Sequence, residues 1–396
     1  FDDVVSEWDV IDSAGVFAPH PTDNLGYMDP GGRPEQLIEL PYYVSQTNNV
    51  TAHHTTAFVQ DTWRLGLNAG DLDLHLGVRA HRWSALPNPW ATERNTHLVG
   101  GPRAHASFTP KAKPLTTYRV SGGWYYQPPF YREMRGFDGQ INPEVAPQRA
   151  IHAVAGVDHE FSSKGRPFKV VGELYWKDLD QLIPYEIENV RQRYYATNNS
   201  EGYAAGLDVL LNGEFIPGIQ SWLRMSALTT AEDLVDDSYE EYYNEDGFQV
   251  VPGYHSGTFA AITDTVLVQP GMIPRPADQR FSLSLLFQDE MPRNPDYKVL
   301  LSLFYGSGLP YGPPSMNRYQ DVLRTPAYRR VDVGFSRVMF SKDSEKSGLI
   351  SLEVFNLLGI NNTINHNWIQ DVNGRYYAVP NFLTGRRVNL KVSLQF

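Results

Sequence analysis

The end of the chain alternates between apolar and polar residues. Val388, Leu390, Val392, Leu394 and Phe396 are apolar, and the residues between them are polar. Alternation with a period of two predicts a strand with one apolar face and one polar face. Chain ends fray unless the fold holds them, so a last strand that closes on an aromatic residue indicates a paired strand. This pattern is typical of the last strand of a bacterial outer-membrane barrel, whose apolar face points toward lipid. An edge strand of a soluble sandwich is the alternative.

The same alternation recurs along the chain, and helical periodicity is nearly absent. Leu72, Leu74, Leu76 and Val78, for example, alternate with polar or small residues. Strands of roughly 9–11 residues suit a tilted crossing of a bilayer. We predict thirteen strands, at residues 53–65, 71–83, 102–109, 116–127, 148–161, 167–180, 203–213, 219–231, 278–288, 297–305, 327–340, 348–356 and 386–396.

Short and long connections alternate between these strands. The short ones are rich in Gly, Pro, Asn and Lys, which favour tight turns. The long ones cover residues 84–101, 128–147, 181–202, 232–277, 306–326 and 357–385. Outer-membrane barrels have short periplasmic turns and longer extracellular loops. The alternation therefore favours a transmembrane antiparallel β-barrel over a soluble sandwich.

The direction of the last strand sets the direction of the others. If Phe396 lies at the periplasmic rim, strand 53–65 also runs inward, and residues 1–52 form an extracellular loop region or partial strand. Single-chain bacterial barrels have an even number of strands. The odd count leads us to expect the C-terminal part of a larger barrel, with residues 53–396 in its wall. A further strand near residues 36–46 would restore an even count.

Composition narrows these options. The 396 residues contain no apolar run of about 18, so no helix is expected to cross a membrane and a membrane form would be a barrel. Aromatic residues make up 13% of the chain, enough for girdles at the two membrane interfaces. The absence of cysteine excludes disulfides and thiolate metal sites. A net charge of -11 argues against a nucleic-acid partner.

Six segments resemble strands of one family. They are residues 57–63 with 76–79 (AFVQDTW and LGVR), 122–129 (GGWYYQPP), 326–332 (PAYRRVD), 354–358 (VFNLL) and 385–396. In this order they are similar to the barrel of TonB-dependent outer-membrane receptors of the Bacteroidota type. The resemblance runs from Ala57 to Phe396.

The resemblance implies a fold and a role. Large barrels of this kind have 22 strands around a plugged lumen. This chain would supply about 13 of a probable 22 strands, and the plug domain and TonB box are not present in it. The implied partners are outer-membrane lipid, an N-terminal remainder of the barrel with its plug (from the same gene product or a separate chain) and TonB through that plug. A surface lipoprotein is a further partner that the resemblance allows.

The implied function is energy-coupled uptake of a glycan, a peptide or a metal chelate across the outer membrane. No cofactor is implied. No catalytic motif such as Gly-x-Ser-x-Gly or His-Glu-x-x-His occurs, so we expect no enzyme. One alternative is a receptor-like barrel that acts as a scaffold in an outer-membrane complex. Another is a soluble secreted β-protein that binds or cleaves glycans.

An acidic segment opens the longest connection. Its tyrosines are interleaved with carboxylates, and it contains no Lys or Arg. We interpret it as an exposed outer loop, with ligand or partner contact and calcium binding as alternatives. The acidic residues are Glu232, Asp233, Asp236, Asp237, Glu240, Glu241, Glu245 and Asp246, and the candidate contact residues also include Tyr242 and Tyr243.

The last long connection places aromatic residues beside amides. His366 lies between two asparagines and close to Trp368, and Tyr376 and Tyr377 follow. Rings stack on ligands while amides form hydrogen bonds, so this segment is a candidate for sugar or peptide contact. A packed loop is the alternative. His53 and His54 are adjacent on a strand and point to opposite faces, so we predict no metal site there.

Overall fold

The computed structural model describes residues 2–11, 43–86, 95–188, 191–216, 219–251, 255, 257–291, 294–313, 322–339, 347–370 and 376–395. Nearly all of its regular structure is β, with one 3-10 turn, η1 (Gly257–Ala260). Among these residues no helix has the length and apolarity to cross a bilayer.

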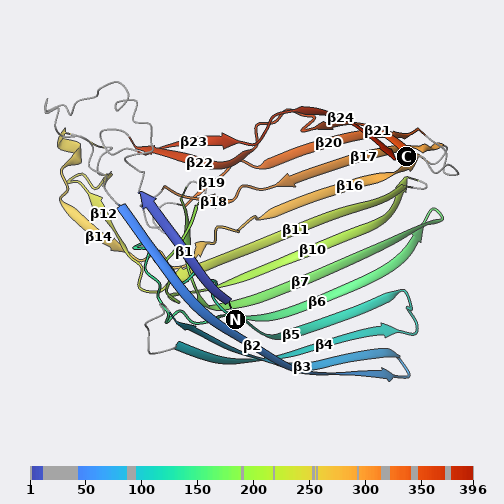
Figure 1. The fold of residues 1–396 in the computed structure, drawn as a ribbon, viewed down its shortest axis with the longest axis horizontal. Helices are drawn as coiled ribbons and strands as arrows, with labels where there is room; N and C mark the ends of the chain where they lie inside the picture. The colour runs from blue at the N-terminus through green and yellow to red at the C-terminus, as the bar shows by residue number, and fades with distance from the viewer. Residues whose placement is uncertain are drawn as a thin grey trace.

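One antiparallel sheet dominates the molecule, and its strands follow chain order (Figure 1). A short strand, β15 (Ile273–Pro274), pairs with β11 outside the main path. The path consists of β1 (Asp2–Ile11), β2 (Tyr43–Gly66), β3 (Gly70–Leu86), β4 (Asn95–Pro110), β5 (Thr116–Gln127), β6 (Gln148–Ser163), β7 (Arg166–Leu182), β10 (Ser200–Ile216), β11 (Ile219–Leu234), β16 (Phe281–Met291), β17 (Asn294–Gly306), β20 (Tyr328–Val338), β21 (Ser347–Phe355) and β24 (Arg387–Gln395).

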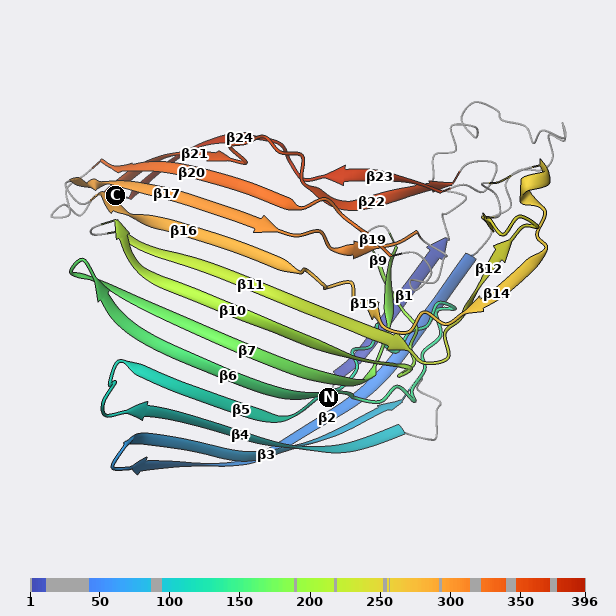
Figure 2. The ribbon, with the colours of Figure 1, turned by 180° about the vertical axis from the view of Figure 1, so that it is seen from behind.

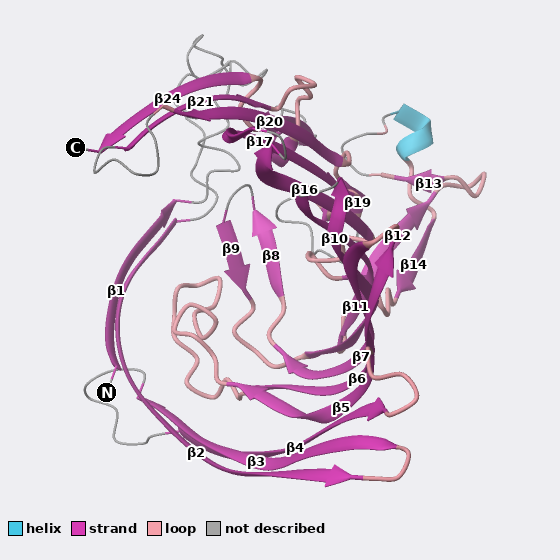
Figure 3. Ribbon diagram, turned by 90° about the vertical axis from the view of Figure 1, so that its right-hand side faces the viewer, coloured by secondary structure: helices cyan, strands magenta, loops and turns pink. Residues whose placement is uncertain are grey.

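The sheet curves into an open gutter (Figure 3). The short turns and the C-terminus lie at one end, and the long connections gather at the other (Figures 1 and 2). We call this second end the mouth. The turn between β6 and β7 illustrates the short connections: Lys164 and Gly165 both have positive φ, 51° and 73°. Two residues of this kind fit the right-handed twist of a hairpin.

The two faces of the sheet differ in chemistry. Residues paired across antiparallel strands share a face, and Val388, Val354 and Val333 are paired in this way. Large apolar side chains are exposed on this convex face, including Leu390 at 66% and Leu174 at 61%. An apolar outer band is what a barrel presents to lipid.

The concave face is polar. Arg119 Nη2 lies 2.6 Å from Asp158 Oδ1 and 3.1 Å from Glu173 Oε1, and Lys169 Nζ lies 3.4 Å from Asp158 Oδ2. Charged side chains paired along neighbouring strands are typical of a polar barrel interior. The alternation therefore separates a lipid-facing side from a lumen-facing side.

Two long connections fold back into the concave side and build the main apolar cluster. Met134 and Ile183, at 0% and 3% exposure, pack with Trp83 of β3. The hairpin of β8 (Tyr185–Glu188) and β9 (Arg191–Tyr194) stands inside the curve of the sheet (Figure 3). The polar inner face of the sheet provides no apolar core. The two connections therefore bury their apolar side chains against each other and against Trp83, inside the mouth.

Two of the segments that carry the resemblance meet at the mouth end of β20 and β21. Asp332 Oδ1 accepts hydrogen bonds from Arg330 Nε–H at 2.8 Å and from the Asn356 backbone N–H at 2.8 Å. Asn356 has a φ of 51°, and its side chain forms two hydrogen bonds with the backbone of Ile360. The two segments therefore fix where the last long connection leaves the sheet.

Each of the thirteen predicted strands corresponds to a strand of the sheet, and the predicted all-β fold is confirmed. The range 1–52, expected to be an extracellular loop region or partial strand, contains β1 and the first ten residues of β2. These two pair from Asp2 with Ala52 to Ile11 with Tyr43. Within the described residues the path therefore holds fourteen strands rather than an odd number, because β1 adds one.

The long connections carry short strands of their own. Besides β8 and β9, they form a sheet of β13 (Gln249–Val250), β12 (Tyr239–Tyr243) and β14 (Asp264–Val268). They also form the pair β18 (Pro310–Tyr311) and β19 (Leu323–Arg324), and the pair β22 (Thr363–Gln370) and β23 (Tyr376–Phe382). The mouth is therefore built of small hairpins on top of the main sheet.

Candidate functional site

A pocket of about 310 Å³ lies at the mouth between several of these hairpins. Tyr311 enters it from β18, and His366 and Trp368 enter from β22. Phe304, near the end of β17, and Tyr328, at the start of β20, form its wall toward the main sheet. This volume lies at the lower end of the range for small-ligand sites.

Three rings form the centre of the pocket. Tyr311 and His366 are stacked, with centroids 4.1 Å apart and planes 9° from parallel. Trp368 lies 5.9 Å from Tyr311 at an angle of 38°. Ring groups of this kind bury a large apolar area and leave faces and edges for a flat ligand. The aromatic group is therefore the feature of the mouth best suited to recognition.

The pocket is neutral. None of the described residues around it is Asp, Glu, Lys or Arg, and its polar groups include Gln279, Ser307, Thr325 and Asn365. Burial lowers the pKa of His366, which favours the neutral imidazole at pH 7. Its Nδ1 atom is buried and has no hydrogen-bond partner among the described residues. The arrangement suits a ligand that offers hydroxyl or amide groups beside an apolar surface.

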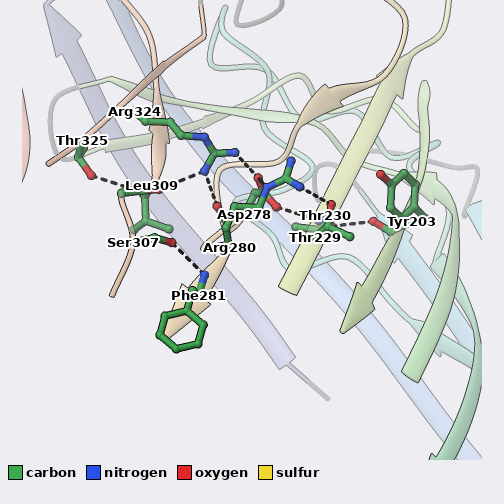
Figure 4. A network of polar contacts seen from close by, with 11 residues as sticks. Tyr203, Thr229, Thr230, Asp278, Arg280, Phe281, Ser307, Leu309, Arg324 and Thr325 are labelled. Atoms are coloured by element: carbon green, nitrogen blue, oxygen red, sulfur yellow. Dashed lines mark hydrogen bonds and ion pairs between the residues drawn. The ribbon is translucent and has the colours of Figure 1, made fainter. Parts of the chain in front are cut away.

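A buried carboxylate anchors the rim beside the pocket (Figure 4). Asp278 is fully buried, and Arg280 Nε lies 2.7 Å from its Oδ2 atom. Arg324 forms a second ion pair with Asp278 and donates to its backbone carbonyl at 2.8 Å. The Thr230 backbone N–H donates to Asp278 Oδ1 at 2.9 Å. A buried charge is stable only when paired and hydrogen-bonded, and both conditions are met here.

This ion-pair group holds the strand that carries Tyr311. Arg324 lies on β19, which pairs with β18 through Pro310 and Tyr311. Leu309 and Thr325 exchange hydrogen bonds of 3.0 and 2.9 Å, one through the Thr325 hydroxyl (Figure 4). Asp278 thus positions the pocket without lining it.

Glu232, predicted to lie in an exposed acidic loop, belongs to the end of β11 and is 1% exposed. Arg275 Nε lies 3.1 Å from its Oε2 atom, and the Ser200 hydroxyl donates to the same oxygen at 3.4 Å. The expectation of an exposed Glu232 is therefore wrong, because the compensating charge comes from a residue outside the acidic segment.

The remaining acidic segment is ordered by its tyrosines. Tyr242 donates to Glu240 Oε2 at 2.8 Å, and Tyr243 donates to Glu241 Oε2 at 2.7 Å. These hydrogen bonds raise the pKa of both tyrosines. The tyrosine hydroxyls thus supply the donors that a segment without Lys or Arg lacks.

Two other candidates of this segment lie just before β12. Burial, and then the neighbouring carboxylate of Asp233, raise the pKa of Asp237. Asp236 is exposed and adopts a φ of 66° in the turn that follows β11. Neither residue lines the aromatic pocket.

Of the predicted candidates, the pocket brings together His366 and Trp368 only. Tyr377 pairs with Ile369, so it points to the other face of the β22–β23 hairpin and is 52% exposed. The Tyr376 backbone pairs with Gln370. Sequence reasoning missed Tyr311, whose one signal is its place in the turn-forming segment 308–312 (GLPYG).

No group of three or more His, Asp or Glu side chains with metal-binding geometry occurs among the described residues. His54 lies against His81 of the neighbouring strand, with Nε2 and Nδ1 3.1 Å apart. His53 and His54 thus occupy successive positions of β2, on opposite faces.

No family model and no curated protein matches the chain. Solved structures do. One, described as the copper transporter OprC, has a TM-score of 0.58 at 14% identity over 91% of this chain and 51% of its own. The FrpB iron transporter from Neisseria meningitidis has a TM-score of 0.55 at 13% identity over 87% of this chain and 45% of its own. The ferric yersiniabactin uptake receptor FyuA from Yersinia pestis has a TM-score of 0.55 at 14% identity over 89% of this chain and 47% of its own.

The chain therefore spans about half the length of these proteins. At this identity the likeness establishes the fold, an antiparallel transmembrane β-barrel wall. The three proteins are described as two transporters and an uptake receptor.

Proposed function

We propose that this chain forms the C-terminal part of the barrel of a TonB-dependent receptor in the bacterial outer membrane. The sheet supplies the lipid-facing wall, and the hairpins at the mouth face outside the cell. The observation that carries the proposal is the separation of an apolar convex face from a polar concave face, combined with all long connections at one end.

The family type and partners extend this proposal. The resemblance of segments 57–63, 122–129, 326–332 and 354–358 supports a receptor of the Bacteroidota type. A plug and the remaining strands then come from elsewhere in the receptor, and TonB acts through that plug. A surface lipoprotein over the mouth hairpins is part of the same proposal. The similar structures of a copper transporter, an iron transporter and a ferric yersiniabactin uptake receptor support uptake of a nutrient as the role.

The aromatic pocket supports a substrate with sugar- or peptide-like groups at the first point of contact. Tyr311, His366 and Trp368 offer ring faces, and Gln279 and Asn365 stand beside them. Sugars and peptides present apolar faces beside hydroxyl or amide groups, which match this neutral lining.

Purification of the receptor from its own cells tests the assignment. We expect the chain in the outer-membrane fraction, soluble only in detergent, together with polypeptide that supplies a plug. Uptake of its nutrient should cease when TonB is inactivated. Recovery of the chain from the soluble fraction would contradict the membrane assignment, and a degenerate plug with uptake independent of this protein would indicate a scaffold.

Mutation of the pocket tests the site. Trp368→Ala removes the largest ring, and we expect weaker substrate capture by the receptor in detergent with an unchanged amount of folded protein. Tyr377→Ala is the matched control, because Tyr377 lies on the other face of the same hairpin. Equal effects of the two substitutions would exclude the pocket as the point of contact.

A further inference from the structure

A second and larger pocket, of about 660 Å³, lies mainly against the concave face over β2 to β5. Arg79, Arg103, His75 and His105 line it, together with Tyr125. Their strand positions place these five side chains on the polar face: His75 is paired with His105, and Arg103 with Gly123, two positions from Tyr125. No Asp or Glu is among the described residues that line this pocket.

The two guanidinium groups have no compensating charge within the described part of the chain. Among the described residues neither Arg79 nor Arg103 has a carboxylate within ion-pair distance. Each lies over a ring instead: Arg79 is 5.7 Å from the centroid of Phe58, and Arg103 is 4.2 Å from that of Tyr125. Arg103 Nε is buried without a hydrogen-bond acceptor. A buried donor without an acceptor is costly, so an acceptor would stabilise Arg103 Nε, as it would Arg119 Nε on the same face.

Several other charged groups on the same face are paired. Arg119, on the strand that also carries Tyr125, binds Asp158 and Glu173 at 2.6 and 3.1 Å. Arg64 Nε, nearer the short turns, lies 3.7 Å from Asp73. Arg79 and Arg103 thus differ from Arg119 and Arg64, which each have a carboxylate within 4 Å.

The remaining groups of the pocket suit an anion as well. The His75 and His105 rings lie 5.4 Å apart, and the Thr62 hydroxyl contacts His75 Nδ1 at 3.0 Å. Gly77 also lines the pocket, on the strand position between His75 and Arg79 and paired with Arg103. Imidazole and guanidinium N–H groups can both serve as hydrogen-bond donors to an anion.

We propose that this pocket binds a small molecule with a carboxylate, phosphate or sulfate group, held by Arg79 and Arg103 with the histidines beside it. Guanidinium groups match such anions in geometry as well as charge. The volume fits a small molecule rather than a single acidic side chain, and the exposed ring of Phe58, at 69%, adds an apolar surface. The inference rests on the proposed function, because the anion bound in this pocket would be the nutrient that the receptor transports through its lumen.

Binding of citrate, pyrophosphate and sulfate to the complete receptor, purified in detergent, tests the inference. Calorimetric titration at low salt should show binding of at least one probe. Arg79→Gln and Arg103→Gln should each weaken it about tenfold or more, because each removes a charge-assisted hydrogen bond. The matched control is Arg64→Gln, which removes an arginine from the same face outside the pocket and should leave the affinity within about twofold.

Three outcomes would overturn the inference. One is the absence of binding by all three probes, and another is equal affinity in the arginine variants. The third is a large loss of thermal stability in the Arg79→Gln, Arg103→Gln double variant without any probe binding, which would show that an acidic side chain of the receptor occupies the pocket. The titration requires neither TonB nor transport, so failure of the proposed function would appear separately, as loss of outer-membrane location or TonB dependence.

Discussion

The wall and the mouth of this molecule are stabilised in opposite ways. In the wall, each strand pairs with the preceding and the following strand of the main path. The apolar side chains of the wall point outward, as those of Leu174 and Leu390 do. The mouth has an apolar cluster inside, around Met134 and Ile183, and fully buried carboxylates such as Asp278. Lipid provides the apolar environment of the wall, whereas the mouth must build its own environment from loop residues.

This difference predicts where substitutions act. In the wall, the face on which a residue lies should decide its effect. In the mouth, the effect of a substitution should depend on the contacts that the residue makes with segments distant in the sequence. The following variants are ordered from the largest expected effect to the smallest.

Asp278→Ala should be the most damaging change. It leaves Arg280 and Arg324 without their shared carboxylate, and loss of one partner of a buried pair costs about 3–5 kcal/mol. Thermal unfolding of the receptor in detergent would measure the loss. Glu245→Ala, at an exposed acidic position of the mouth, should change the melting temperature little. Equal shifts for the two variants would remove the anchoring role of Asp278.

Leu390→Arg should follow, with about 2–4 kcal/mol lost if the position lies near the bilayer midplane. Its neighbour Asn389 faces the lumen and donates to Glu353 Oε2 at 3.0 Å, so Asn389→Arg should be tolerated. Heat-modifiable migration on gels reports the folded fraction of each variant. A well-folded Leu390→Arg protein would contradict a lipid-facing strand.

Met134→Ala should have an intermediate effect. Met134 is fully buried among loop residues, and the smaller side chain leaves a cavity that costs about 2 kcal/mol, at the lower end because loops can partly collapse. Phe130→Ala, at a position 59% exposed in the same connection, is the control. Hydrogen exchange of residues 128–147 should increase in the first variant and not in the second.

Glu133→Gln should have the smallest effect and should change the pH dependence of the mouth. Burial raises the pKa of Glu133 above its ordinary value of 4.5, despite a hydrogen bond from the Phe130 N–H. Because the folded state holds the proton more tightly, the connection is stabilised at low pH, and this contribution is lost as pH rises from about 4.5 through the raised pKa. The hydrogen-exchange protection factors of this connection should differ less between pH 4 and pH 7 in the variant than in the unsubstituted protein.

The wall could be predicted from the sequence because its pattern is local. Alternating positions such as Val388 to Leu394 give both the strand and the face, and turn residues such as Lys164 and Gly165 mark the short hairpins. The exception is the pair β1 and the start of β2. Polar residues occupy both faces of segment 45–49 (SQTNN), so alternation does not reveal a strand there.

The mouth could be predicted only in part because its contacts join distant segments. His366 and Trp368 were identified from their type, but Tyr311, which completes the ring group, comes from another connection. Glu232 was expected to be exposed because no Lys or Arg stands near it in the acidic segment, yet Arg275 reaches it through the pairing of β15 with β11. Sequence spacing does not carry this information.

The polarity of wall and mouth can be measured directly, because the chain contains no cysteine. Single cysteines are introduced as Asp246→Cys in the mouth and Lys164→Cys in a short turn, both at exposed positions. Intact cells are treated with a maleimide that does not cross membranes. Because the mouth faces outward, we expect labelling of the Asp246→Cys protein on intact cells and of the Lys164→Cys protein only after the outer membrane is permeabilised. Labelling of Lys164→Cys on intact cells, with Asp246→Cys protected, would contradict this expectation.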